Sequence, residues 1–451
     1  MRKTRSRRFI PATALALAAI TSLAACSGGG GGGGEQGGGS GSGSGAASGT
    51  DPDKFTVMTA NENPTLESLL TQLSEDQCAA ENEALPIEHQ KVAQADVVQK
   101  ITLLASQDAM PAHTIAGTAL IRPDGDLGAA GLVQDLQAAL EDSGGWENVL
   151  PAAASTEENV YGGFVSMPYQ YNIEGFWYNK QIFEEQGIEV PTTWEDLLAA
   201  ADTLQQAGVQ PMTTAGAQGF PLTRLMGMYI FRNVGPDAME AIRDGDAKLT
   251  DEEYVAGAQA LADLAATGYF GEGFTTRDGD TSTNLFLTGT AAMTYDGSWI
   301  LGAVNDPERN QIGGENVGFF PFPEVEGGEG SIEQYPANAG APMIISAKTY
   351  GPKVADWVSC IAENYGGLAL NEAGVISGFT VNEEVTDISP NTAEIQELIS
   401  GIDEETVLWF EALFDPKSNS LASTNATLLT TGQMTAEDYM AALQESIDAN
   451  K

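Results

Sequence analysis

Short apolar runs alternate with amphipathic helical stretches along the sequence from Phe55 onward. Residues 55–58 predict a strand, and Pro64 then opens a predicted helix whose leucines recur at helical spacing. Thr193 and Asp196 have the spacing of a capping box ahead of another helical stretch. This alternation is typical of an α/β fold, and 451 residues suffice for two or three domains or for one large two-lobed body.

Composition excludes several classes of protein. The chain carries 63 Asp and Glu against 20 Lys and Arg, a formal net charge of −43, so it is not a nucleic-acid binder that depends on clustered basic residues. Its 42% hydrophobic content excludes a disordered acidic chain. Because it has only three scattered cysteines and two histidines, His89 and His113, we expect no bound metal and no cofactor.

The N-terminus predicts export. Basic residues between Arg2 and Arg8 precede an apolar stretch at residues 10–23, which is shorter than the ~20 residues that a transmembrane helix needs. Residues 1–25 are therefore predicted to be a signal peptide. Its end, Leu-Ala-Ala followed by Cys26, resembles the lipobox of bacterial lipoproteins, which implies that Cys26 carries diacylglycerol. Residues 26–52 then comprise this cysteine and a flexible Gly/Ser tether.

Two alternatives remain at this end of the chain. The segment could be a plain signal peptide with a chance cysteine, and the pair Arg7-Arg8 allows Tat export, although Sec export fits better. No later segment reaches 18 uninterrupted apolar residues. We therefore expect an exported protein on the outer face of the cytoplasmic membrane, which it contacts through its lipid anchor alone.

Four short segments between residues 178 and 346 resemble, in the same order, segments of one protein family. They read YNKQIF at 178–183 with GI at 187–188, PTTWEDL at 191–197, FLTGTAAM at 286–293 with GSW at 297–299, and NAGA at 338–341 ahead of MIIS at 343–346. Together they resemble the family 1 extracellular solute-binding proteins of bacterial sugar ABC importers, which are sugar-binding lipoproteins. The resemblance covers about residues 55 to 451.

This resemblance implies an α/β, two-lobed periplasmic-binding-protein fold, with the ligand in a cleft between lobes joined by hinge strands. Lobe I would comprise residues 53–170 and 324–372, and lobe II residues 171–323 and 373–451. The crossings would lie near residues 170–173, 320–324 and 370–378. The implied function is capture of a carbohydrate, an oligosaccharide in particular, by hinge closure and its delivery to the permease of an ABC transporter. Such a protein is a monomer and catalyses no reaction.

A sugar presents a face of C–H groups and a rim of hydroxyls, so its site needs aromatic platforms and side chains that donate and accept hydrogen bonds. Trp299 follows the turn-like pair Gly297-Ser298 and is the first candidate platform, the alternative being a core tryptophan. Asp296 precedes that turn and could accept hydrogen bonds from hydroxyls, or it could be a solvated turn residue.

Further ligand-binding candidates lie in loops and at the proposed hinge. The loop after the first predicted strand is at a carboxyl end, where open α/β sheets place ligands; helix capping by Asn63 is the alternative reading of this loop. Trp177 and Trp409 could be core or cleft residues, with core favoured. The remaining candidates are Asn61, Glu62, Tyr169, Gln170, Asn172, Asn338 and Gly340.

An enzyme is the alternative function: a lipid-anchored glycoside hydrolase that uses paired carboxylates. Chance pairs are unavoidable among 63 acidic residues, but no segment resembles a glycosidase signature.

The cysteines give a separate prediction. With Cys26 committed to lipid, Cys78 and Cys360 are an even pair in an exported protein and are expected to form a disulfide, the alternative being two buried thiols.

Overall fold

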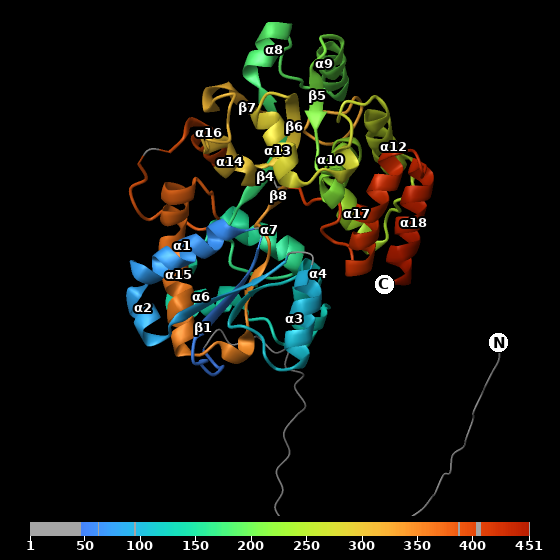
Figure 1. Cartoon of the computed structure of the whole chain (residues 1–451). Coiled ribbons are helices and arrows are strands. Elements are labelled where there is room, and N and C mark those ends of the chain that lie inside the picture. The colour runs from blue at the N-terminus through green and yellow to red at the C-terminus, as the bar shows by residue number, and fades with distance from the viewer. Residues whose placement is uncertain (1–46, 62, 94–95, 387, 403–406, 451) are drawn as a thin grey trace, which may run out of the picture. The chain divides into compact units, whose positions relative to one another are not determined.

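Two sheets, each covered by helices, make up the part of the chain that the computed structural model describes, residues 47–61, 63–93, 96–386, 388–402 and 407–450 (Figure 1). These residues fall in a single compact unit. No helix within them is both long and apolar enough to cross a membrane. The two sheets define two lobes, and the α/β class predicted from the sequence is confirmed.

The first lobe is built on a sheet of order β2-β1-β3-β9, in which β1, β2 and β3 are parallel and β9 is antiparallel to β3. Its strands are β1 (Phe55–Ala60), β2 (Ile87–Val92), β3 (His113–Ile115) and β9 (Met343–Ile345). Its helices are α1 (Pro64–Glu75), α2 (Ala79–Ala84), α3 (Val97–Ser106), α4 (Thr118–Ile121), α5 (Asp126–Ala129), α6 (Leu136–Ser143), α7 (Pro151–Tyr161) and α15 (Pro352–Ala373). Figure 1 shows α1, α2 and α15 side by side, and they are in contact.

The first core forms because β1 and its covering helices bury apolar side chains on facing surfaces. The leucines of α1 fall on one face and are buried, and Asn63 caps the helix by accepting a hydrogen bond from Leu66 N at 3.3 Å. Phe55 stacks on Trp357 of α15 with ring centroids 5.0 Å apart. The chain therefore returns to the first lobe late, through α15, to complete its core.

The second lobe is built on a sheet of order β5-β6-β4-β7, with β8 also paired to β4. Its strands are β4 (Asn172–Asn179), β5 (Gln210–Thr213), β6 (Ala291–Gly297), β7 (Val317–Phe320) and β8 (Ala337–Asn338). Its helices are α8 (Lys180–Gln186), α9 (Trp194–Gln206), α10 (Phe220–Val234), α11 (Ala238–Asp244), α12 (Glu252–Ala266), α13 (Gly279–Leu287), α14 (Leu301–Asn305), α16 (Pro390–Ser400), α17 (Pro416–Thr430) and α18 (Ala436–Ala449). The capping box of Thr193 and Asp196 is present at the start of α9.

The chain returns from the second lobe to the first later than the sequence suggested. Phe322 and Val325 pack in the second core, and β8 pairs with β4, so residues 324–338 lie with the second lobe. Backbone hydrogen bonds between Glu324 and residues Thr192 and Trp194 hold this segment there. The return therefore falls at residues 339–342, between β8 and β9, and the expected boundary at 324 is corrected.

Residues 407–414 form a segment that packs against both lobes. Leu408 and Ala412 pack in the first core, whereas Val407, Phe410 and Phe414 pack in the second. Phe379 also lies in the first core. The expected assignment of all residues from 373 to 451 to lobe II is therefore corrected, because this part of the chain contributes to both cores.

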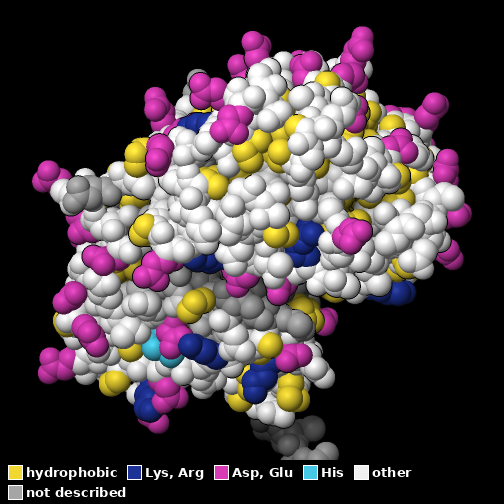
Figure 2. Space-filling model, turned by 45° about the horizontal axis from the view of Figure 1, so that its top comes forward, with side chains coloured by type: hydrophobic (Ala, Val, Ile, Leu, Met, Phe, Trp, Pro, Cys, Tyr) yellow, Lys and Arg dark blue, Asp and Glu magenta, His cyan; other side chains and the backbone are white. Residues whose placement is uncertain are grey.

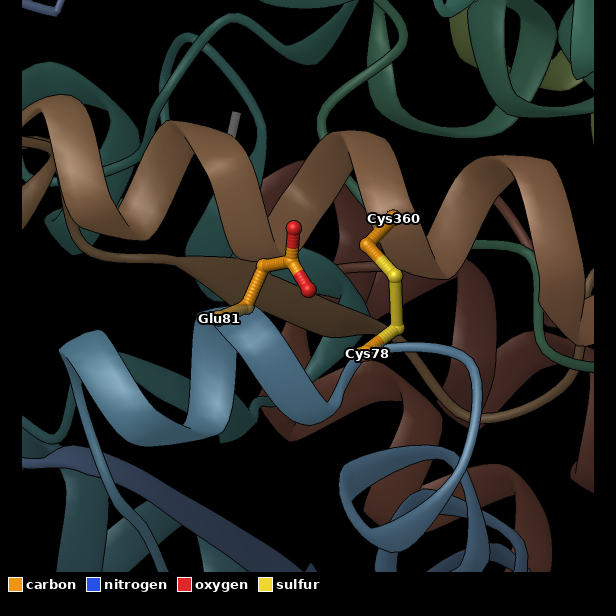
Figure 3. Close-up of side chains that lie close together, drawn as sticks. All are labelled: Cys78, Glu81 and Cys360. Carbon is orange, nitrogen blue, oxygen red and sulfur yellow. A yellow bond between two sulfur atoms is a disulfide. The ribbon is translucent and has the colours of Figure 1, made fainter.

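Cys78 and Cys360 form a disulfide with their Cα atoms 5.9 Å apart (Figure 3). It joins the residue preceding α2 to α15 within the first lobe. With Glu81 they make the group of possible metal ligands found among the described residues. Because the two sulfurs are bonded to each other, neither offers a thiolate to a metal.

Candidate ligand-binding site

Asn172 and Asn338 face each other where two connections enter the second lobe. They are register partners in β4 and β8, and Asn172 Nδ2 donates to Asn338 Oδ1 at 3.2 Å. Gly340 N donates to the same Oδ1 at 3.0 Å. Gly340 has φ +79°, and a Cβ built there would lie 3.1 Å from Gln170 Cβ. Four of the predicted residues thus meet at the lobe junction.

Hydrogen bonds extend this pair toward the interior of the second lobe. Ser298 Oγ donates to Asn172 Oδ1 at 3.4 Å and accepts from Ile173 N at 3.3 Å. On the other side, Asn338 Nδ2 donates to Glu174 Oε1 at 3.5 Å. The asparagine pair is therefore held on both sides, which restricts the rotamers of two amides at the junction.

Three charged side chains continue this network, Glu174, Arg224 and Glu411, and we call them the junction triad. The sequence analysis did not predict them as site residues. Arg224 Nη1 of α10 donates to Glu174 of β4, and Arg224 Nε lies 3.9 Å from Glu411 Oε1. Thr223 Oγ1 donates to Glu411 at 2.7 Å. Burial raises the pKa of Glu411, and the charge of Arg224 counteracts this shift. The guanidinium therefore compensates carboxylates from two different chain segments.

Arg224 also lies over an aromatic ring. Its guanidinium carbon is 4.7 Å from the centroid of Trp409, which is half-buried. Gly227, one turn further along α10, makes this approach possible, because a Cβ there would lie 2.6 Å from Phe410 Cβ. Trp409 is thus a residue of the lobe junction, which the sequence left undecided.

Asp296 and Trp299 lie at the end of β6 and in the short 3₁₀ turn after it, residues Ser298–Ile300. Both are half-buried. The Trp299 ring covers Gly297, where an added Cβ would come within 2.1 Å of the indole. Burial raises the pKa of Asp296 to about 7, against the opposing effects of the Gly297 amide, the Trp299 side chain and the charge of Arg224. An aromatic ring and a carboxyl group therefore stand together beside the triad.

Some predicted residues lie elsewhere. Tyr169 is 4% exposed, its hydroxyl hydrogen-bonds His113 Nε2 at 2.8 Å, and its ring packs against Tyr365, so we place it in the first core as a correction. Asn61 is exposed after β1, and its backbone N donates to Val92 O at 2.8 Å. Glu62 and Cys26 lie outside the described residues. Trp177 is 1% exposed and is a core residue.

A cavity of about 400 Å³ lies between the lobes, where residues 413–416 form part of its wall. The first lobe contributes residues 119–126, which follow the carboxyl end of β3, and the second lobe contributes parts of α11, α17 and α18. Arg122 lines it and donates to the carbonyl oxygens of Val160 at 2.9 Å, of Phe414 at 3.5 Å and of Ala412. The open α/β rule places ligands at such carboxyl ends. None of the residues of the polar network lines this cavity, so the two are separate parts of the lobe junction.

Residues 84–362 match the sequence pattern of the family described as bacterial extracellular solute-binding protein, which is more than half of the chain. The chain therefore belongs to this family of binding proteins.

Curated relatives fall within the same class. The multiple sugar-binding protein of Streptococcus mutans is 26% identical over 210 residues, 45% of this chain and 48% of that protein. The sn-glycerol-3-phosphate-binding periplasmic protein UgpB of Agrobacterium fabrum is 26% identical over 220 residues, 46% of this chain and 48% of that protein. These alignments span less than half of each relative's length.

Solved structures share the fold over nearly the whole described body. A protein from a study of xylan utilization by Caldanaerobius polysaccharolyticus has a TM-score of 0.76 at 21% identity, covering 87% of this chain and 100% of that one. A chitin oligosaccharide binding protein has a TM-score of 0.75 at 22% identity, covering 88% and 98%. At these identities the likeness establishes the two-lobed fold.

Proposed function

We propose that this protein captures a carbohydrate, an oligosaccharide in particular, at the lobe junction and delivers it to the permease of an ABC importer. The observation that carries the proposal is the placement of Trp299 and Asp296 beside the hydrogen-bonded asparagines and the junction triad. An aromatic face with amide and carboxylate groups around it suits the C–H face and the hydroxyl rim of a sugar. Relatives named for sugar binding support the same reading.

Capture proceeds by hinge closure, in which the ligand contacts both lobes only in the closed form. The junction suits this mechanism because three segments meet there: β4, β8 and residues 407–414. The reaction is binding alone, so the protein uses no cofactor and catalyses no step. Its partners are the carbohydrate and the permease subunits, and the protein works as a monomer.

The protein is exported and anchored by lipid at Cys26, and the tether joins the first lobe. Gly49 N donates to Tyr350 O at 2.9 Å, and Asp51 Oδ1 accepts from Lys353 N at 3.0 Å and Val354 N at 3.2 Å. These bonds cap the start of α15 with the end of the tether. The first lobe is then the one held to the membrane, and the second is the one that moves.

Isothermal titration calorimetry of the full chain with neutral xylo-, chito- and malto-oligosaccharides tests the proposal. We expect saturable binding by one of them, and stabilisation by about 2.7 kcal/mol at a hundredfold excess over Kd. The radius of gyration from small-angle scattering should fall on binding. Release of shorter sugars would instead favour the glycoside hydrolase, and absence of binding by a folded protein would reject the proposal.

Trp299→Ala tests the platform. We expect a 30- to 150-fold weaker affinity, from about 2–3 kcal/mol of lost apolar contact. Trp146→Ala is the matched control, because Trp146 is also half-buried but packs on Phe164 in the first lobe. The control should lower the melting temperature and leave the affinity unchanged. Equal affinity losses in the two variants would contradict the platform assignment.

A further inference from the structure

Carboxylates outnumber cations at the lobe junction. Glu174, Glu411 and Asp296 surround Arg224, whose Nη1 donates to Glu174 and whose Nε lies 3.9 Å from Glu411 Oε1. Asp296 forms no ion pair within the described part of the chain, and its carboxylate accepts from Gly297 N at 3.0 Å. The only charge opposing it in the triad is therefore already shared by two other carboxylates.

The cavity between the lobes has the same excess. Its acidic lining residues are Asp124, Asp126 and Asp415, and its basic ones are Arg122 and Arg243. Arg122 donates to three backbone carbonyls, and Arg243 pairs with Asp244 at 2.8 Å. Figure 2 shows acidic side chains scattered over this face, many of them toward its edges, and fewer basic ones.

An anionic ligand needs the opposite arrangement. A phosphate or carboxylate is recognised by uncommitted guanidinium, ammonium or backbone N–H donors, and a nearby unpaired carboxylate repels it. A hydroxyl, by contrast, donates to a carboxylate and accepts from an amide or a guanidinium. The junction therefore offers many acceptors for hydroxyl protons and few donors for an anion.

We propose that the lobe junction selects sugars without anionic groups and rejects phosphorylated and uronic-acid-bearing ones, with Asp296 as the residue that discriminates. This inference rests on the proposed carbohydrate binding. It also separates two kinds of relative, since some matched proteins are named for sugars and others for sn-glycerol 3-phosphate. The excess of carboxylates at the junction groups this chain with the relatives named for sugars.

The pH dependence follows from the groups around Asp296. The charged and titratable side chains coupled to it are Arg224 and Tyr295, and the Trp299 side chain also lowers its pKa. Burial raises the pKa of Asp296 to about 7, so the carboxyl group is largely ionised at pH 8 and largely protonated at pH 6. Rejection of anions is then strongest at pH 8.

Calorimetry with paired probes tests this inference. The pairs are xylotriose and its glucuronic-acid-substituted form, maltotriose and its 6-phosphate, and glycerol and sn-glycerol 3-phosphate. In the pair that binds, we expect the Kd of the anionic member at pH 8 to be at least tenfold higher than that of the neutral member. At pH 6 this ratio of Kd values should be smaller. In Asp296→Asn the ratio at pH 8 should fall toward one and lose its pH dependence.

Asp280→Asn is the matched control, because the Asp280 side chain is 87% exposed and pairs with Arg309 on the surface of the second lobe. It should keep the wild-type ratio at both pH values. An anionic probe bound as tightly as its neutral partner at pH 8, or an Asp296→Asn ratio equal to that of wild type, would overturn the inference and leave the proposed function standing. If a folded protein binds neither member of any pair, carbohydrate binding itself fails.

Discussion

Replacing Arg224 by Ala should expose how much the fold depends on the junction triad. The guanidinium side chain is 13% exposed and its partners Glu174 and Glu411 are 2% and 4% exposed, so removing it leaves two carboxylates without their cation in a region with little water. Breaking a buried ion pair by removing one partner costs about 3–5 kcal/mol. Loss of the contact over Trp409 adds about 0.5–1 kcal/mol. We expect the free energy of unfolding to fall by about 4 kcal/mol at pH 8.

The pH dependence of this loss identifies its cause. Burial raises the pKa of Glu411 and Arg224 lowers it, so removing Arg224 raises it further. A carboxyl group whose folded pKa exceeds its unfolded value binds more protons in the folded state, so its contribution to stability decreases as pH rises between the two values. The difference in free energy of unfolding between wild type and Arg224→Ala should therefore be smaller at pH 5 than at pH 8.

Urea denaturation at both pH values measures the effect. Arg243→Ala is the control, since the Arg243 side chain is 48% exposed and its pair with Asp244 lies on the surface. Its removal should change the free energy of unfolding by less than about 0.5 kcal/mol. A loss below 1 kcal/mol for Arg224→Ala, or one that is equal at pH 5 and pH 8, would refute the idea that uncompensated burial of charge is responsible.

Three further predictions concern stability. Reducing the Cys78–Cys360 disulfide, which spans 282 residues, should cost up to about 5 kcal/mol in urea denaturation and leave sugar affinity unchanged, because both cysteines lie in the first lobe; a change in affinity alone would contradict this. Burial lowers the pKa of His113 to about 4, so the unfolded chain binds a proton there at higher pH than the folded one. The free energy of unfolding should therefore fall by about 3 kcal/mol as pH drops from about 6.5 to 4, and His113→Gln should remove this dependence. Because the formal net charge is −43, sodium chloride at about 1 M should raise the melting temperature by screening repulsion, and an unchanged value would count against repulsion as a significant cost.

The parts of this molecule that could be predicted are those set by local sequence. The helix after Pro64, the capping box of Thr193 and the strand at residues 55–58 depend on neighbouring residues, and each is present. The lobe boundary at residue 324 was wrong for a reason that is not local. Glu324 bonds to Thr192 across more than a hundred residues of chain, and no pattern around residue 324 records that contact.

The junction triad was missed for the same reason. Glu174 lies 50 residues from Arg224, and Thr223 lies 188 residues from Glu411, so neither pairing is visible in a sequence window. A signal did exist. A single arginine within the apolar stretch FPLTRLMGMYIF, and a single glutamate within NIEGFWYN, indicate charges that must find partners when buried. Those signals predict that partners exist without saying which residues they are.

The triad and the asparagine pair take their members from three segments at the lobe junction. Glu174 comes from β4, Asn338 from β8, and Glu411 from residues 407–414. A rotation of one lobe against the other changes the directions of these three segments, and with them the distances within the network. Among the described residues, Arg224 Nε and Glu411 Oε2 lack hydrogen-bond partners, so the arrangement seen is not the one that satisfies the network fully. If the lobes close as proposed, the triad lies beside the residues proposed to contact sugar, so ligand binding and closure would be coupled through direct contacts.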